Sequence, residues 1–161
     1  MNSKDLLRAG AGGNWPRINE FFDKTVVRQI NDASCVAAAA EMLCRDNGLT
    51  VAQSEILSSI GEFANSEILI SYLNQRFRST GGWLGGFADG TENEVAIRNL
   101  IATVPAFLGI LREGRPMGHA VLVRAADIQT YVRIHDPFDQ TSYNMTFENF
   151  IQVISEVVYK R

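Results

Sequence analysis

The sequence predicts an α+β fold in which helices come first and an antiparallel β-sheet follows. Helical patterns dominate residues 34–103, and extended apolar segments dominate after Pro105. The length of 161 residues is typical of one domain with its own core. We therefore expect residues 18–161 to form a single domain. Residues 1–17 mix glycine, alanine, asparagine and charge, and we expect them to be a flexible lead-in.

Four helices are expected before the sheet. The strongest pattern is at residues 34–47, which are rich in alanine, leucine, methionine and glutamate and stop at Asn47-Gly48. The others are expected at residues 51–61 with Thr50 as the N-cap, at residues 66–77, and at residues 92–103 with Thr91 as the N-cap. The segment at residues 79–91 carries closely spaced glycines and is expected to be a loop.

Strands are expected at residues 106–112, 118–127 and 130–137, separated by turn-forming segments. The first is a nearly continuous apolar run, as in a buried strand. The tail, residues 146–160, is expected to begin as a helix capped by Thr146 and to end as a strand.

Composition excludes several classes of function. The chain is 46% hydrophobic and 20% charged, with a net charge of −3, as in ordinary soluble globular proteins. It has no basic stripe for a phosphate backbone, so we expect no nucleic-acid partner. Its apolar stretches are shorter than the ~20 residues of a membrane-spanning helix, and its start lacks the apolar core of a signal peptide. We therefore expect no membrane partner and a cytoplasmic location.

The two cysteines differ in position along the first helix. Cys35 lies in the first turn, where unpaired N–H groups and the helix dipole favour a thiolate. Cys44 lies ~13 Å further along on the opposite face, so we expect it to pack in the core. That separation exceeds the ~7 Å limit for a disulfide, and free thiols suit a reducing compartment. Taken alone, Cys35 is more often a buried small hydrophobe than a nucleophile.

A nucleophilic cysteine needs a base, and the chain has two histidines. In the expected strand at residues 130–137, Val132, Ile134 and Asp136 alternate with His135, so Asp136 should point inward and His135 outward. A hairpin would bring Asp136 beside His119, leaving the second ring nitrogen of His119 for Cys35. The alternative is that His119 is a satisfied core histidine and that Asp136 begins a turn.

Acyl transfer also needs hydrogen-bond donors for the developing oxyanion. The Cys35 N–H is available at the helix start, and the Gln29 side chain precedes it by six positions. A glutamine in a loop is usually solvent-exposed, so the assignment of Gln29 to the oxyanion hole rests only on this spacing.

Gln29, Cys35, His119 and Asp136 together resemble the papain-like cysteine peptidases. In that family an oxyanion-hole glutamine lies six positions before a nucleophile at a helix start, and histidine and asparagine or aspartate follow on the sheet. The Cys35–His119 interval is shorter than the roughly 130–150 residues of large papains. Compact relatives fit better, notably the bacteriocin-leader peptidases, which cut after a double glycine and have a similar Gly-His strand followed by Asp-Pro. Many of those have aspartate and glycine where this chain has Ser34 and Val36.

The resemblance implies a papain-like fold, with an N-terminal helical part whose nucleophile helix packs on a C-terminal antiparallel sheet. It implies a thiol hydrolase with a Cys35-His119-Asp136 triad and Gln29 in the oxyanion hole, with no metal or other cofactor. A groove between helices and sheet would hold a protein or peptide substrate, with a Gly-Gly cleavage preference. Trp83 and Gly118 are the expected substrate contacts, and Trp83 with Phe87 would form one lip of the groove. The alternative is that these aromatics pack the glycine segment.

Small papain-like domains also serve as toxic ends of bacterial effectors that a dedicated secretion system delivers into target cells. The free thiols, the lead-in and the missing signal suit that role, and a neutralising immunity protein would then be a partner. Two alternatives stay open. One is another acyl transfer on the same scaffold, such as deamidation, transglutamination or amide hydrolysis, and the other is a catalytically silent peptide-binding domain.

Overall fold

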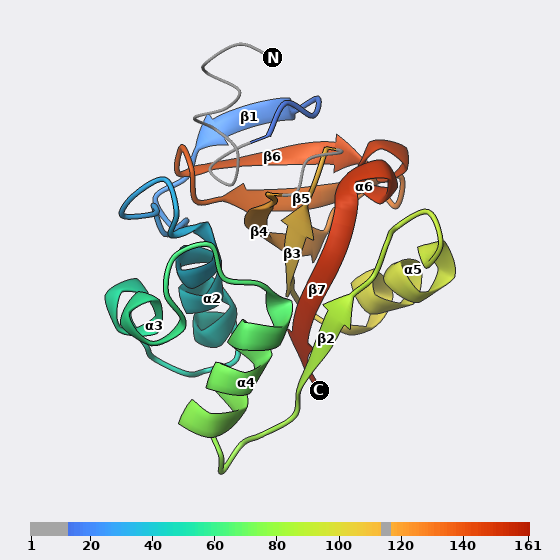
Figure 1. Cartoon of the computed structure of the whole chain (residues 1–161). Helices are drawn as coiled ribbons and strands as arrows, with labels where there is room; N and C mark the ends of the chain where they lie inside the picture. The colour runs from blue at the N-terminus through green and yellow to red at the C-terminus, as the bar shows by residue number, and fades with distance from the viewer. Residues whose placement is uncertain (1–12, 114–116) are drawn as a thin grey trace.

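One antiparallel sheet organises the molecule. In this computed structural model, residues 13–113 and 117–161 are described. Their seven strands form a sheet in the order β1-β6-β5-β4-β3-β7-β2, with every neighbouring pair antiparallel (Figure 1). The strands are β1 (Ile18–Phe22), β2 (Trp83–Phe87), β3 (Phe107–Leu111), β4 (His119–Ala125), β5 (Tyr131–Asp136), β6 (Thr141–Thr146) and β7 (Ile154–Lys160).

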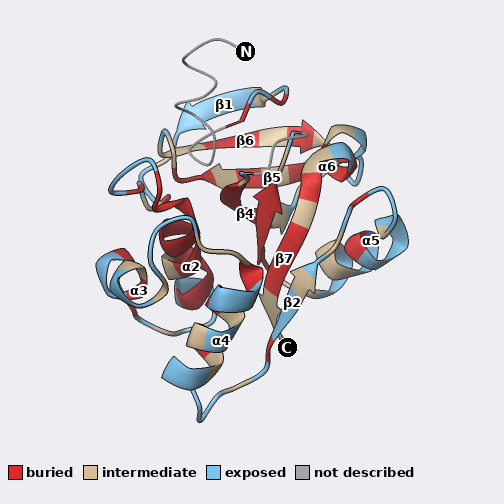
Figure 2. Cartoon of the chain, in the orientation of Figure 1, coloured by how far each residue is buried: buried red, intermediate tan, exposed pale blue. Residues whose placement is uncertain are grey.

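Helices cover both faces of the sheet. They are α2 (Cys35–Asp46), α3 (Gln53–Ile60), α4 (Ser66–Arg76), α5 (Glu94–Thr103) and α6 (Phe147–Val153). The first three share one hydrophobic core with the sheet, and α5 and α6 share a second core with its opposite face. Figure 2 shows buried residues concentrated in α2 and in the central strands. The α+β fold class predicted from the sequence is confirmed.

Helix α2 is the most deeply buried helix segment. Its alanines at positions 37–40 are at most 1% exposed, and side chains this small let the helix lie close to β3 and β4. Ser34 stands at the N-cap and Asn47 at the C-cap, followed by Gly48 with a φ of 73°. A glycine adopts this left-handed conformation without strain, as the Asn-Gly stop predicted. The start of α2 is thereby fixed beside the sheet.

The structure differs from the expected elements in three strands. Strands β1 and β6 lie in segments without a clear apolar alternation, and β2 lies inside the expected glycine loop. In β2, Gly85 has a φ of 133°, and a Cβ atom there would lie 2.0 Å from the Val157 carbonyl oxygen. The glycines are therefore what allows this strand to pair with β7. Ala52 and Asn93, rather than Thr50 and Thr91, stand at the N-caps of α3 and α5.

Part of the expected lead-in packs on the sheet. Residues 1–12 lie outside the described residues, so the prediction for them stays a prediction. Residues 13–17 precede β1, and Trp15 among them is only 5% exposed and belongs to the second core. These five residues are structurally part of the domain.

Candidate active site

Cys35 lies at the first position of α2, as the sequence predicted. The loop before it is held by Asn31 and Ser34: the Asn31 N–H donates to Ser34 Oγ at 3.1 Å, and Ser34 Oγ donates to the Asn31 carbonyl at 3.1 Å. The Cys35 side chain is 5% exposed. Its Sγ accepts a hydrogen bond from the Ala120 N–H at 3.5 Å, so the thiol lies against the start of β4.

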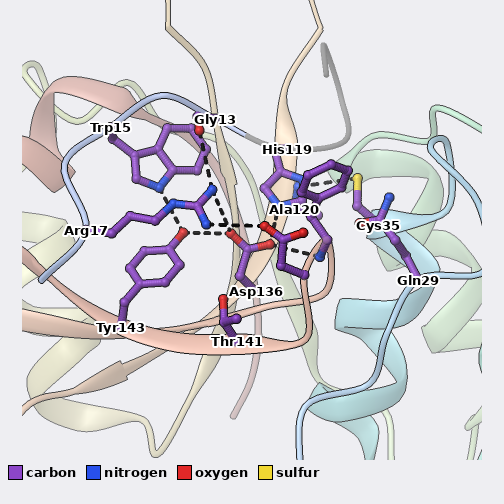
Figure 3. A network of polar contacts seen from close by, with 12 residues as sticks. Gly13, Trp15, Arg17, Gln29, Cys35, His119, Ala120, Asp136, Thr141 and Tyr143 are labelled. Carbon is purple, nitrogen blue, oxygen red and sulfur yellow. Dashed lines mark hydrogen bonds and ion pairs between the residues drawn. The ribbon is translucent and has the colours of Figure 1, made fainter. Parts of the chain in front are cut away.

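His119 and Asp136 form a buried pair at adjacent strand ends. His119 begins β4 and Asp136 ends β5, and their side chains are 1% and 0% exposed. The His119 Nε2–Asp136 Oδ1 distance is 2.6 Å (Figure 3). The Phe138 N–H also donates to Oδ1, at 3.0 Å. The predicted strand alternation thus places Asp136 where it orients the imidazole.

Charge and hydrogen bonding dominate the electrostatics of this pair. Burial disfavours the charged forms of both residues, but their mutual attraction outweighs it. Asp136 and, to a lesser extent, Cys35 raise the pKa of His119 to about 10. His119, Arg17 and the Tyr143 hydroxyl lower the pKa of Asp136 to about 2. At neutral pH the pair is therefore an imidazolium and a carboxylate.

The second ring nitrogen of His119 faces the sulfur side of the site. His119 Nδ1 is buried, and a hydrogen bond with the Cys35 side chain contributes to the raised pKa of His119. The arrangement therefore leaves Nδ1 for proton exchange with Cys35.

Gln29 lies in the loop between β1 and α2 and is 8% exposed. Its N–H donates to the Pro137 carbonyl at 3.0 Å, so this loop is tied to the turn after Asp136. Its Nε2 donates to the Asn31 carbonyl at 2.8 Å, and an amide nitrogen has a second proton to donate. The structure brings Gln29, Cys35, His119 and Asp136 to one end of the sheet (Figure 3).

Three residues of the site were not found from the sequence. Trp15 stacks on His119 with ring centroids 6.1 Å apart, Tyr143 donates a hydrogen bond to Asp136 Oδ2 at 2.7 Å, and Arg17 NH2 lies 3.8 Å from the same oxygen. A tryptophan within a glycine-rich lead-in was the available signal, since large aromatic side chains are usually buried on folding. The contacts of Trp15 depend on how residues 13–17 pack against the sheet, and sequence periodicity does not predict that packing.

The structure corrects the prediction for Trp83. Its side chain is 1% exposed and packs in the core near α4, so it cannot form the lip of an open groove, and the packing alternative holds. Phe87 is 65% exposed on β2, at the sheet edge, and the site residues lie toward β4 and β5. A Cβ atom at Gly118 would lie 2.5 Å from Ile110 Cγ2, so this glycine permits close packing on β3. Its contact with substrate stays a prediction.

The remaining cysteine and histidine lie outside the site. Cys44 is fully buried, and burial raises the pKa of its thiol to about 12, as expected of a packing residue. His135 is partly buried on the opposite side of β5 from Asp136, where its Nε2 accepts from Arg124 Nε at 3.1 Å. Burial and the Arg124 charge lower the pKa of His135 to about 4.

The cysteine lies at the start of a helix that packs on the sheet, and the histidine and aspartate lie at the ends of adjacent strands. This is the architecture of the papain-like cysteine peptidases, as the resemblance predicted. The structure is similar to the peptidase domain of Streptococcus ComA, a bifunctional ABC transporter involved in quorum sensing (TM-score 0.65, 12% identity, 83% of this chain and 94% of that one). It is also similar to a double-glycine-motif protease from an AMS/PCAT transporter, solved with a leader peptide (TM-score 0.60, 14% identity, 89% of this chain and 91% of that one).

In sequence, the chain is similar to cysteine protease effector 1 of Escherichia coli O1:K1:H7. The two are 31% identical over 148 residues, which cover 92% of this chain and 29% of the relative. The chain thus spans less than a third of the length of that relative. No family model matches the sequence. Within residues 13–113 and 117–161, no helix is long and apolar enough to cross a membrane, and no group of three metal-ligating side chains is present.

Proposed function

We propose that the chain is a cysteine peptidase that cleaves a protein substrate through Cys35, His119 and Asp136. The observation that carries the proposal is the buried His119–Asp136 pair beside a thiol at a helix start. Supporting it are the sequence similarity to a protein named cysteine protease effector 1 and the structural similarity to peptidase domains.

The proposed reaction proceeds in two acyl-transfer steps. His119 Nδ1 holds the proton of Cys35, and the thiolate attacks the peptide carbonyl to form a C–S bond and an oxyanion. When the C–N bond breaks, the His119 imidazolium gives its proton to the leaving amine. Neutral His119 then takes a proton from water as the water attacks the thioester, and this releases the acid and restores the thiol. Asp136 keeps the imidazole oriented throughout.

The oxyanion is assigned to two donors. The first is the Cys35 N–H, which lies at the start of α2 on the same residue as the attacking sulfur. The second Nε2 proton of Gln29 would complete the hole. A narrow groove at this end of the sheet would favour small residues at the cleavage site, and the similarity to a double-glycine-motif protease supports a Gly-Gly preference.

We further propose that the peptidase is the toxin domain of a delivered bacterial effector. The name of the relative as an effector, of which this chain spans 29%, supports this role. The action would then take place in the cytosol of a target cell, with an immunity protein in the producing cell as a partner.

The test is to express the 161-residue chain in bacteria and to map new protein N-termini by mass spectrometry, with the Cys35→Ala variant beside the wild type. New termini after Gly-Gly with wild type alone are expected. Cys44→Ala is the matched control, since it also removes one buried thiol, and it should cleave like the wild type. A +1 Da shift at glutamine without new termini would instead indicate deamidation. Toxicity or partner binding that is unchanged in Cys35→Ala would indicate a silent binding domain.

A further inference from the structure

We infer that Trp15, in the segment that precedes β1, is a positioning residue for the His119–Asp136 pair. It acts by covering the imidazole and by donating a hydrogen bond to Tyr143, which in turn donates one to Asp136. The inference rests on the proposed function for its catalytic consequence. The protonation of His119, which Trp15 is inferred to influence, can be measured without a substrate.

The local sequence prepares residues 13–17 for this contact. The chain bends at Trp15, just before Pro16 and the start of β1. Trp15 is buried and Arg17 half-buried, while Asn14 and Pro16 are exposed. The indole lies against Gly13, where a Cβ atom would be 1.9 Å from the Trp15 ring. The absence of a side chain at position 13 is therefore what leaves room for the ring.

A chain of hydrogen bonds links Trp15 to His119 through Tyr143 and Asp136, and its direction is fixed. An indole N–H can only donate, and Trp15 Nε1 donates to Tyr143 Oη at 2.8 Å. The Tyr143 hydroxyl in turn donates a hydrogen bond to Asp136 Oδ2 at 2.7 Å. Asp136 Oδ1 is left to accept from His119 Nε2 at 2.6 Å. This order keeps one proton of His119 on Nε2, where Asp136 accepts it, and leaves Nδ1 on the side of the thiol.

The same indole shields the pair from water. Its ring lies nearly parallel to the imidazole, with an interplanar angle of 22°, and Phe138 contacts the imidazole edge-on with ring centroids 6.4 Å apart. Arg17 lies over the Tyr143 ring, 4.8 Å from its centroid, and its NH2 donates to the Gly13 carbonyl at 3.3 Å. An ion pair attracts more strongly where water is excluded. The proposed active site therefore depends on the docking of residues that lie before the first strand (Figure 3).

The experiment uses the full chain and two readouts that need no substrate. The first is the titration of His119 by side-chain NMR, and the second is the rate at which iodoacetamide alkylates Cys35 at pH 7, followed by mass spectrometry. Trp15→Ala removes the cover and the donor, and Gly13→Ala removes the room for the ring. In both variants the pKa of His119 is expected to fall by about one unit or more toward its ordinary value, and alkylation should slow about tenfold.

Two conservative variants separate positioning from general packing. Trp15→Phe keeps an aromatic cover without the N–H, so both readouts should lie between wild type and Trp15→Ala. Tyr143→Phe removes the donor to Asp136 and should raise the pKa of that carboxyl from about 2, whereas Tyr159→Phe, a control in the same hydrophobic core, should not. Trp83→Phe, which loses a buried indole far from the pair, should leave the His119 titration unchanged.

Wild-type values of both readouts in folded Trp15→Ala and Gly13→Ala would overturn the inference, and if either fails to fold, wild-type values in Trp15→Phe would do so. Failure of the proposed function is distinguishable, since it would show as absent cleavage by the wild type while the NMR and alkylation differences persist.

Discussion

Individual residues acquire their properties from their neighbours, as the two histidines show. His119 lies beside a carboxylate, and His135 accepts a hydrogen bond from a guanidinium. Their pKa values move in opposite directions, to about 10 and about 4. The same side chain is thus an acid at neutral pH in one place and a neutral acceptor in the other.

The two histidines should be distinguishable by their titrations in ¹⁵N-edited NMR spectra. His119 is expected to stay protonated until the pH approaches about 10, and His135 to stay neutral until the pH falls to about 4. Asp136→Asn should return His119 toward its ordinary range, because the largest source of attraction is removed, and His135 should be unchanged. A His119 midpoint near 6.5 in the wild type would contradict the buried ion pair.

These shifts also set how stability depends on pH. The folded-state pKa of His119 is raised. Its contribution to the free energy of unfolding is therefore fully present below about pH 6.5 and is lost as the pH rises toward 10. The pKa of His135 is lowered, so its contribution is present above about pH 6.5 and is lost as the pH falls toward 4. Both effects favour greatest stability near the ordinary histidine pKa.

At the scale of elements, helix α3 holds the loop that carries Gln29. Gln53, at the start of α3, accepts a hydrogen bond from the Ile30 N–H at 2.8 Å and donates to the Arg28 carbonyl at 2.9 Å. These two backbone groups flank Gln29. Gln53 is 6% exposed, so water cannot readily replace it. The loop that carries Gln29 is therefore held by a residue more than 20 positions later in the sequence.

Replacing Gln53 tests this support. Gln53→Ala leaves two backbone groups without partners and is expected to lower the free energy of unfolding by about 2 kcal/mol, measured by urea denaturation. Peptidase activity should also fall, through kcat rather than KM, because Gln29 loses its fixed position. Gln75→Ala, an exposed glutamine on α4, should change neither quantity by a measurable amount. Wild-type kcat in Gln53→Ala would argue against a role for this loop in the reaction.

At the scale of the whole molecule, the buried carboxylate of Glu156 links a helix to the sheet. Glu156 on β7 is fully buried, and its Oε1 accepts from the N–H and hydroxyl of Ser66 at 2.9 and 2.6 Å. Its Oε2 lies 2.6 Å from Arg112 NH1. This carboxylate therefore joins the start of α4 to β7 and to the residue that follows β3. Removing one partner of a buried ion pair leaves the other without compensation.

Glu156→Gln is expected to lower the free energy of unfolding by about 3 kcal/mol, measured by urea denaturation. The fractional exposure of Arg112, 25%, keeps the loss at the lower end of the usual range for buried pairs. Glu55→Gln is the matched control, since Glu55 pairs with Arg76 at a site where both side chains are more than 40% exposed, and its cost should stay below about 1 kcal/mol. Equal losses in the two variants would contradict a special role for Glu156.

Much of the site was predictable because its determinants are local. The alanine-rich run with its Asn-Gly stop fixes α2 and therefore the position of Cys35 at the helix start. Alternation in β5 separates Asp136 from His135, and the apolar run after His119 fixes β4. Strand β2 was not predicted because its glycines suggested a loop, and β1 and β6 were not predicted because their segments lack a clear apolar alternation.

The sequence by itself determined the α+β order of elements, the helix that carries Cys35 and the strand faces that present His119 and Asp136, because helix and strand periodicities are set by neighbouring residues. Only the tertiary structure decided that Trp83 is core, that Gln53 holds the loop before α2, and that Trp15 covers His119. These contacts join segments that are distant along the chain, and which of them form depends on how the packed layers fit together.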